Sequence, residues 1–412
     1  MRLPLVVPGH SVMDILEASA LSLPQAAVLP DYGACGLFAL AASIRAFLDG
    51  DSWRAPGERV CAHDEVAGAT VLVFILVDGL GDGFLQRHGA GGSLLAHRRA
   101  RLSSVFPSTT ASAVTTMLTG LAPVTHGLTG WHIHDRRFGG VIAPLPMKVR
   151  AGGRVTGPLV LRRLFPYDSI FSRRRRPSIM ISPRAIAHSR FSQRHCRGAG
   201  IRPHDGLADM VAAIETAVAE LSAHRGGYVH AYYPTFDALS HDFGSHSEEA
   251  VAEFWRIDAA LGDLFGRCAT SGTSIVVSAD HGFIDSPDEC QLRLEDYPEF
   301  AGMLDSALFG ERRVAFCAVR AGAEDDFLAA ASDILAGKGK VLRSADLLSA
   351  GLLGPGPRHP RIEERIGTHT LLMEPGWTIR DIMPGERPHH MIGVHGGLTP
   401  HEMWVPLITA TT

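Results

Sequence analysis

The stretch TVLVFILVDG, residues 70–79, is an almost unbroken apolar run that ends at an aspartate. Such a run is typical of a β-strand that is buried on both faces of a sheet. Two stretches repeat the pattern, GGYVHAYYPTFD at residues 226–237 and TSIVVSADHG at residues 273–282. Because helical patterns separate these runs, the sequence predicts an α/β fold. We expect a three-layer α/β/α sandwich with a mostly parallel central sheet.

Each of these three runs leads into an aspartate. Asp78 ends the first run, Asp237 follows the second across a short turn, and Asp280 ends the third. Each acid alone is explained equally well as a turn or helix-capping residue. Together, however, they lie beyond the carboxyl ends of parallel strands, where α/β sheets bind ligands. Three carboxylates at one edge repel one another unless a proton or a cation neutralises them, so we expect a cation there.

Histidines near these acids strengthen the expectation of a metal site. His281 directly follows Asp280, and His241 lies four residues after Asp237, a spacing that puts both on one helix face. His395 lies among glycines in MIGVHGGLTP, which lets the backbone approach a crowded site. Asp and His ligands without cysteine suit zinc, or less selectively manganese or iron. Six such residues divide into two sets of three, which predicts two divalent ions.

A further stretch, VFPSTTASAVTTMLTG at residues 105–120, is rich in Ser and Thr where a helix should start. These residues are poor in helix interiors because their hydroxyls compete for backbone hydrogen bonds. We therefore expect one of the hydroxyls to serve in chemistry. Capping of the helix is the alternative explanation for those at its start.

Composition sets limits on the class of protein. The chain has 412 residues, 46% of them hydrophobic, and a net charge of −4, which gives no global case for binding nucleic acid or a membrane surface. Its first 20 residues lack the apolar run of a signal peptide, and no run is long enough to span a membrane. We therefore expect a cytoplasmic location. The scattered cysteines predict reduced thiols: Cys35, Cys61, Cys196, Cys268, Cys290 and Cys317.

Five segments in order resemble the signatures of a known family. They are LVDGLG, FPSTTASAVTTMLTGLAPVTHGLTGW, YYPTFDALSHDFG, SADHGF and IGVHGGLTPHEMWVPLI, and the resemblance runs in order from about Val71 to Ile408. This ordered set is similar to the alkaline phosphatase superfamily, specifically its type I phosphodiesterase and nucleotide pyrophosphatase branch. The resemblance implies an alkaline phosphatase-like sandwich with inserted subdomains.

The resemblance also implies a catalytic residue and its metal ligands. Thr110 would be the nucleophile that forms a phospho-threonine intermediate, with Ser108, Thr109 and Ser112 as lesser candidates. One zinc ion would be held by Asp78, Thr110, Asp280 and His281. The second would be held by Asp237, His241 and His395.

One position departs from the better-known nucleotide pyrophosphatases. They carry an asparagine about twenty residues after the nucleophile, whereas this chain has Trp131 there. Nucleotide specificity is therefore open, and Trp131 either stacks on a substrate or packs in the core. His132 and Arg136, in the polar segment that follows, are candidates for substrate contacts, with solvated loop residues as the alternative.

The domain organisation predicted from the sequence is a single catalytic domain, residues 1–412, with two insertions. Residues 140–205 are a possible specificity insertion and contain the basic run RRRR at residues 173–176. Residues 285–390 contain a strand pattern, RRVAFCAVR, and a helix pattern, DDFLAAASDILAG. Since Asp280 and His395 flank this second stretch, we expect a small inserted subdomain that returns to the site.

The predicted function is a metal-dependent phosphodiesterase or nucleotide pyrophosphatase acting on a small-molecule phosphoester, with a nucleotide among the candidates. Residues 102–130 contain no Arg or Lys, which favours diesters over monoesters unless Arg136 or Arg184 reaches the site. The enzyme alternatives are a phosphomonoesterase, a phosphonate hydrolase and, with a poorer match, a phosphomutase. The alternative that is not an enzyme is an anion- or RNA-binding module that uses the basic run. The sequence does not indicate an oligomeric state.

Overall fold

The computed structural model describes residues 21–24, 26–50, 66, 68–224, 226–268, 272–383, 385–386 and 389–411. The first twenty residues, on which the expectation of no signal peptide rests, lie outside these ranges. Among the described residues no helix has the length and apolar character needed to cross a membrane.

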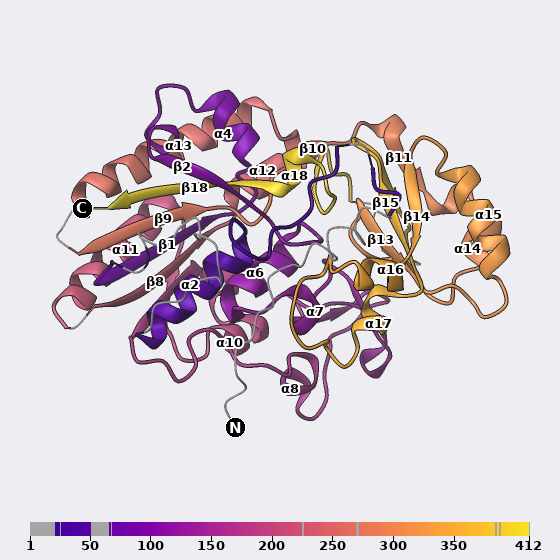
Figure 1. Ribbon diagram of the computed structural model, residues 1–412, viewed down its shortest axis with the longest axis horizontal. Helices are drawn as coiled ribbons and strands as arrows, with labels where there is room; N and C mark the ends of the chain where they lie inside the picture. The colour runs from indigo at the N-terminus through magenta and orange to yellow at the C-terminus, as the bar shows by residue number, and fades with distance from the viewer. Residues whose placement is uncertain are drawn as a thin grey trace.

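A seven-stranded sheet forms the centre of the larger part of the molecule (Figure 1). Five neighbouring strands run parallel to one another, and the three predicted strands are confirmed as β1, β8 and β9. One strand, β18, is antiparallel to both of its neighbours. In spatial order the strands are β2 (Arg98–Ser103), β18 (Trp404–Thr411), β9 (Thr273–Ser278), β1 (Val71–Val77), β8 (Gly227–Tyr233), β6 (Ser178–Pro183) and β7 (Gly200–His204).

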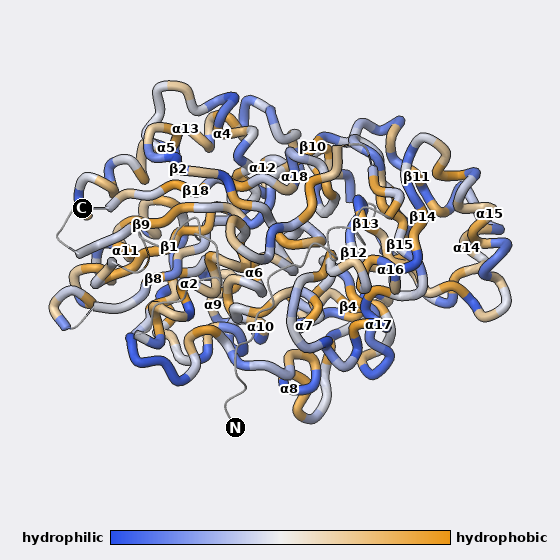
Figure 2. The backbone as a smooth tube through the Cα atoms, viewed as in Figure 1, coloured by the Kyte–Doolittle hydropathy of each residue, from blue (hydrophilic) through white to orange (hydrophobic). Residues whose placement is uncertain are grey.

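Helices cover both faces of this sheet, as expected for an α/β/α sandwich. Helices α2 (Leu37–Asp49) and α6 (Thr110–Thr119) pack together on the front face in Figure 1. Helices α11 (Leu207–Ser222) and α13 (Glu248–Arg267) pack together on the other face. Every residue of β1 is buried, and the hydrophobic colour of Figure 2 is dense along the central strands. Burial on both faces explains why these strands are continuously apolar.

A smaller subdomain with its own apolar core lies within residues 285–390, where the sequence predicts an insertion. It contains a four-stranded antiparallel sheet with the order β12 (Phe309–Gly310), β13 (Val314–Cys317), β15 (His369–Met373) and β14 (Gly339–Arg343). The predicted helix is α15 (Glu324–Ile334). Strand β10 (Ile284–Asp285) pairs antiparallel with β17 (Gly393–Val394), so the chain enters and leaves this subdomain side by side.

Residues 140–205 do not form one insertion. Their first part contributes β4 (Gly140–Ala143) and β5 (Lys148–Val149) to a small sheet with β3 (Ile133–Asp135). Their last part supplies β6 and β7 to the central sheet. The prediction of a specificity insertion is therefore wrong for residues 178–204, which are core strands with the helices between them.

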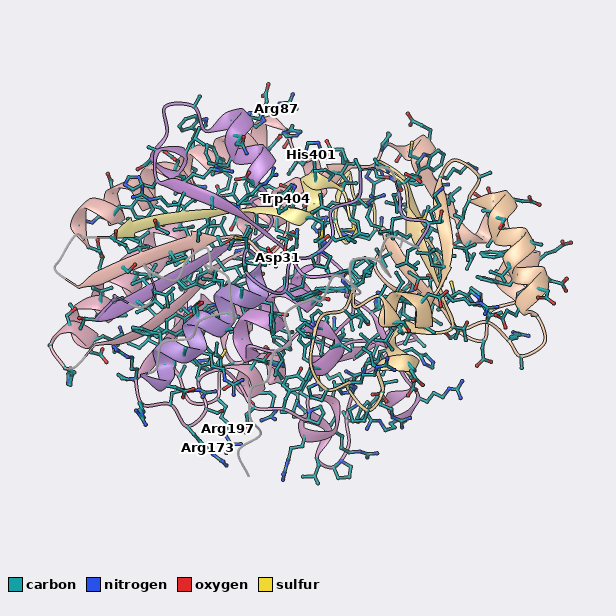
Figure 3. All side chains as sticks on the ribbon, viewed as in Figure 1. Asp31, Arg87, Arg173, Arg197, His401 and Trp404 are labelled. Atoms are coloured by element: carbon teal, nitrogen blue, oxygen red, sulfur yellow. The ribbon has the colours of Figure 1, made fainter. Side chains whose placement is uncertain are left out.

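The basic run at residues 173–176 is partly used inside the protein. Arg174 forms an ion pair with Asp49 at 2.7 Å, and the guanidinium of Arg176 lies 4.1 Å from the centre of the Phe47 ring. Arg173 is exposed at the outer edge of the molecule (Figure 3). The run is thus not a continuous free cationic surface, which weakens the RNA-binding alternative.

The cysteines agree only in part with the expectation of reduced thiols. Four described cysteines are free: Cys196, Cys268, Cys290 and Cys317. Cys35, in contrast, is disulfide-bonded, so the expectation is wrong for that residue.

Candidate active site

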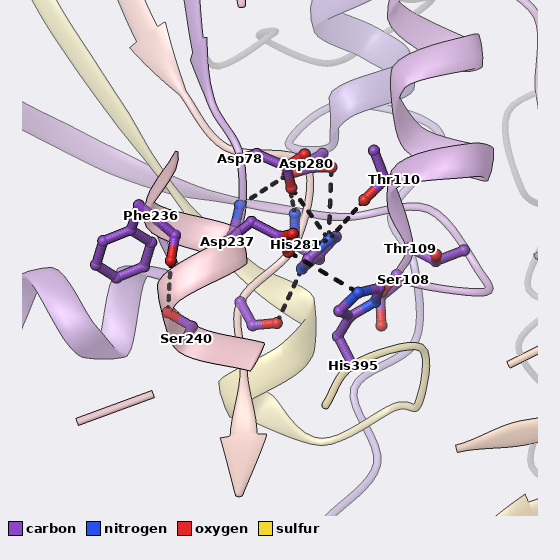
Figure 4. Close-up of polar contacts among 12 residues, drawn as sticks. Asp78, Ser108, Thr109, Thr110, Phe236, Asp237, Ser240, Asp280, His281 and His395 are labelled. Atoms are coloured by element: carbon purple, nitrogen blue, oxygen red, sulfur yellow. Dashed lines mark hydrogen bonds and ion pairs between the residues drawn. The ribbon is translucent and has the colours of Figure 1, made fainter. Parts of the chain in front are cut away.

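Three aspartates meet at the carboxyl edge of the central sheet. Asp78 directly follows β1 and Asp280 follows β9 after one intervening residue. Asp237 lies in the first turn of α12 (Thr235–Phe243), the helix that follows β8. Since β9, β1 and β8 are adjacent parallel strands, their ends deliver all three carboxylates to one place (Figure 4).

Each carboxylate leaves one buried oxygen without a hydrogen-bond partner. Asp78 accepts a hydrogen bond from the Tyr232 hydroxyl through Oδ2, and Asp280 Oδ1 accepts from the backbone N–H groups of Gly79 (3.0 Å) and His281 (3.1 Å). The remaining oxygens, Asp78 Oδ1, Asp280 Oδ2 and Asp237 Oδ1, are buried and have no such partner. A buried polar atom without a partner is costly, so these three oxygens are open for a ligand.

The unpartnered oxygens all face one imidazole nitrogen. They lie 3.4 Å (Asp78), 3.5 Å (Asp280) and 3.8 Å (Asp237) from His281 Nε2. Burial, followed by repulsion from Asp237 and Asp280, holds the pKa of Asp78 well above its usual range. Burial and the charge of Asp280 do the same to the pKa of Asp237. A bound cation would remove this repulsion, and the oxygen donors fit one.

Three histidines direct their Nε2 atoms toward the same place, and each ring is oriented by a hydrogen bond to the backbone. Their Nδ1 atoms donate to backbone carbonyl oxygens: His241 to Gly393 (2.8 Å), His281 to Gly282 (3.1 Å) and His395 to Ser108 (3.2 Å). Because a carbonyl can only accept, Nδ1 carries the proton and Nε2 is left with a free lone pair. Burial lowers the pKa of His241 to about 4 and also lowers the pKa of His395. Neutral imidazoles oriented in this way are ready metal ligands.

Two groups of possible metal ligands have donor atoms within 4.8 Å of one another among the described residues. The first contains Asp78, Asp280 and His281, which the family resemblance assigns to one ion. The second contains Asp237, His281 and His395. His241 lies at the rim of this second group, with Nε2 3.5 Å from Asp237 Oδ1. His281 therefore stands between the two groups, stacked on His395 with ring centres 3.6 Å apart.

The hydroxyl-rich segment brings a threonine to this cluster. Thr110 is the first residue of α6, and its Oγ1 lies 3.2 Å from His281 Nε2. Thr109 occupies the N-cap position, yet its side chain makes no capping hydrogen bond. It donates instead to Glu311 Oε1 at 2.6 Å, so the capping alternative is wrong for its side chain. The Oγ atoms of Ser108 and Ser112 donate to the carbonyl oxygens of Gly397 and Leu128, which explains them structurally.

A cavity of about 510 Å³ opens beside the cluster, between the central sheet and the inserted subdomain. Thr110, Asp237, His241 and His395 line one part of it, and Trp131 and His132 also line it. Trp131 is 43% exposed, which contradicts packing of this residue in the core. Burial, followed by the charge of Arg150, lowers the pKa of His132 to about 4.

Two arginines considered from the sequence do not reach the cavity. The Arg136 side chain is 72% exposed and pairs with Asp305 at 3.3 Å, and Arg184 pairs with Asp205 at 2.8 Å. Neither lines the cavity, so the expectation of a substrate contact from Arg136 is wrong. Arg136 follows β3 directly, and the short helical turn there directs its side chain to solvent.

Several residues of the site have no counterpart in the sequence interpretation. The inserted subdomain contributes Glu311, Arg312 and Arg380 to the cavity. Tyr232, the penultimate residue of β8, donates a hydrogen bond to Asp78. Alternation along β8 could have drawn attention to Tyr232, because a polar hydroxyl in a central strand needs a partner. No local signal identifies the other three residues.

Fold and site together define a protein with the alkaline phosphatase-like fold, built around acids and histidines at the carboxyl edge of the sheet. Residues 72–398 match the model of the family described as type I phosphodiesterase / nucleotide pyrophosphatase. The chain belongs to this family. It is accordingly a hydrolase that acts on phosphoester bonds.

Solved structures of ectonucleotide pyrophosphatase / phosphodiesterases are similar to this chain in fold. One is murine ectonucleotide pyrophosphatase / phosphodiesterase 5, in an inactive threonine-to-alanine form in complex with AMP. It matches with a TM-score of 0.58 and 17% identity, over 82% of this chain and 87% of that one. The human protein of the same name matches with a TM-score of 0.58 and 15% identity, over 83% of this chain and 88% of that one. No curated protein matches the sequence.

Proposed function

We propose that this protein hydrolyses phosphodiester or pyrophosphate bonds of a small, nucleotide-like molecule, with Thr110 as the nucleophile and two divalent ions, most simply zinc, in the Asp and His cluster. The observation that carries the proposal is the convergence of three unpartnered carboxylate oxygens and the Thr110 hydroxyl on His281 Nε2. A structural cluster would have its oxygens hydrogen-bonded.

The surroundings of Thr110 suit attack on phosphorus. As the first residue of a ten-residue helix, Thr110 lies beside backbone N–H groups that have no partner within the helix. These groups and the positive end of the helix dipole favour a phosphate. The Thr110 oxygen would form a bond to phosphorus while the bond to the leaving oxygen breaks on the opposite side. Water would then hydrolyse the phospho-threonine and restore the hydroxyl.

The chain's own residues would hold the ions in two sets. Asp78, Asp280 and His281 would form one set with Thr110. Asp237 and His395 would form the other, with His241 at its rim. When bound, such ions lower the pKa of a hydroxyl nucleophile and stabilise negative charge on the leaving oxygen. Tyr232 orients Asp78, and the three backbone carbonyls orient the imidazoles.

The cavity supports a substrate with a planar group. Trp131 offers an exposed aromatic side chain at the cavity, and stacking on a nucleobase or another aromatic leaving group is its simplest use. The similar mouse protein is described in complex with AMP, which is consistent with a nucleotide here. The same mouse form carries a threonine-to-alanine change and is described as inactive, which supports a threonine nucleophile.

The test is a substrate panel for the zinc-loaded protein. We expect hydrolysis of bis-p-nitrophenyl phosphate to exceed that of p-nitrophenyl phosphate and of a phenylphosphonate ester. A monoester rate that is the highest by a wide margin would overturn the diesterase assignment and favour the phosphomonoesterase. A highest rate with the phosphonate ester would favour the phosphonate hydrolase.

A further inference from the structure

A carboxylate from the inserted subdomain lies beside the nucleophile without belonging to the metal cluster. Glu311 Oε1 accepts two hydrogen bonds of 2.6 Å, one from Thr109 Oγ1 and one from the backbone N–H of Trp131. Thr109 directly precedes Thr110, and Trp131 borders the cavity that Glu311 also lines. Glu311 thus accepts hydrogen bonds from two donors that lie next to the position of the reacting phosphoryl group.

The backbone that carries Glu311 is held firmly against the core of the site. Gly310 donates to the carbonyl oxygen of His132 at 2.7 Å, and His132 donates back to Gly310 at 3.3 Å. A Cβ atom on Gly130 would lie 2.6 Å from Gly310, so the two segments touch backbone to backbone. On the other side of Glu311, the fully buried Arg313 pairs with Glu402 at 3.0 Å. These contacts therefore hold Glu311 in a fixed position in the site.

The charge of Glu311 is not cancelled by an ion pair. Among the described residues no basic side chain lies within ion-pair distance of it, and its neighbour Arg312 donates to the carbonyl oxygen of His389 instead. Burial raises the pKa of Glu311 to about 7, so its carboxyl group is negatively charged in mildly alkaline solution.

We propose that Glu311 determines substrate specificity, by favouring phosphodiesters with one negative charge over phosphomonoesters with two. This inference rests on the proposed phosphoester hydrolysis at Thr110. A phosphomonoester carries close to two negative charges above pH 7, whereas a diester carries one. An additional charge within several ångströms of a fixed carboxylate in a partly buried site raises the free energy of the bound monoester. Electrostatic repulsion of the monoester contributes to substrate specificity in the same way as attractive contacts with the diester do.

The experiment measures binding, so that it does not depend on turnover. Isothermal titration calorimetry of the zinc-loaded full chain at pH 8.5 would compare dimethyl phosphate, a monoanion, with methyl phosphate, a dianion. We expect Glu311→Gln, which keeps the shape and an acceptor oxygen, to raise the affinity for methyl phosphate about tenfold or more. Its affinity for dimethyl phosphate should change by less than about threefold, because the electrostatic term is smaller for one charge.

The matched control is Glu299→Gln, which removes the same charge from an exposed helix of the same subdomain, outside the cavity. It should leave both affinities unchanged. If Glu311→Gln is misfolded by circular dichroism, Glu311→Ala replaces it with the same expectation. An affinity ratio unchanged from wild type in a folded, metal-loaded Glu311 variant overturns the inference. Turnover distinguishes the two proposals, since a protein that shifts its affinity ratio but hydrolyses no ester refutes only the proposed function.

Discussion

His395 donates from Nδ1 to the carbonyl oxygen of Ser108 at 3.2 Å, although the two residues are 287 positions apart in the sequence. The bond joins the turn before α6 to the segment that returns from the inserted subdomain. A second bond, from the Ser108 hydroxyl to Gly397, reinforces this contact. The orientation of one proposed metal ligand therefore depends on the same turn that presents Thr110.

Replacement of His395 should affect one ion and spare the other. In His395→Ala we expect the ion near Asp237 to be lost or weakened, because its set keeps too few ligands. The set of Asp78, Asp280 and His281 remains complete. Elemental analysis should show the metal content fall from about two ions to about one per chain. Unchanged stoichiometry together with unchanged activity would assign His395 to a structural role.

Thr110→Ala should separate metal binding from turnover. The variant should fold and keep its ions through the Asp and His ligands, yet lose activity by several orders of magnitude because the attacking oxygen is gone. Thr110→Ser should retain part of the activity. Acid quenching of a reaction should leave phosphate or its ester on the peptide STTASAV of the wild-type protein, detectable by mass spectrometry.

Thr109→Ala provides the comparison for that experiment. It removes the hydrogen bond to Glu311 but not the attacking atom, so we expect a loss of stability of about 1 kcal/mol and substantial residual activity. Full activity in Thr110→Ala, or an adduct on Thr109, would assign the nucleophile elsewhere.

Metal removal should lower stability and activity together. Without cations the three unpartnered carboxylate oxygens repel one another, so chelation should lower the melting temperature. Asp78→Asn tests the cause, since it removes one charge from the cluster. At pH 8 the metal-free Asp78→Asn protein should be more stable than the metal-free wild type, by roughly 1–2 kcal/mol. A metal-free variant less stable than the metal-free wild type would contradict electrostatic repulsion as the cause.

Buried histidines away from the site should make the protein sensitive to acid. Burial lowers the pKa of His195 and of His230 to about 3, against an unfolded value near 6.5. Below pH 6.5 the unfolded chain therefore binds more protons than the native state. Stability conferred by these two groups is complete above pH 6.5 and falls as the pH decreases toward 3.

Urea unfolding of the metal-free protein at several pH values between 7.5 and 5 would measure this dependence. Each histidine should contribute a slope of up to about 1.4 kcal/mol per pH unit. His230→Gln should reduce the slope accordingly, and the exposed His224 provides a control through His224→Gln. Equal slopes for wild type and His230→Gln would show that His230 is not responsible.

The aspartates and the fold follow from the sequence for the same physical reason. A doubly buried parallel strand must be continuously apolar, so β1 and β9 are visible as runs whose ends show where Asp78 and Asp280 lie. The helix start at Thr110 was likewise predicted by the hydroxyl-rich pattern and the family resemblance. The ligand assignments and the nucleophile remain predictions, although the structure brings their side chains together.

Residues that reach the site through long-range contacts were not predictable in this way. Glu311 approaches Thr109 only because a hairpin of the inserted subdomain packs against a segment about 200 residues earlier in the sequence. No hydrophobic periodicity in the sequence indicates this long-range contact. Arg136 illustrates the opposite error, since nearness in sequence to Trp131 suggested a shared site, whereas the turn after β3 directs Arg136 to solvent. Strand β6 was assigned to an insertion because residues 140–205 lie between the family's signature segments and carry no recognised chemistry.

The antiparallel pair of β10 and β17 gives the inserted subdomain adjacent points of entry and exit. The segment between these two strands can be exchanged as one unit, here called a cassette, because replacing it does not move the ends of the core chain. Every proposed ligand lies outside the span between Asp285 and Gly393, whereas Glu311, Arg312 and Arg380 lie within it. Grafting a cassette from a relative onto this scaffold is therefore a route to redirect substrate choice while the hydrolytic machinery is inherited unchanged.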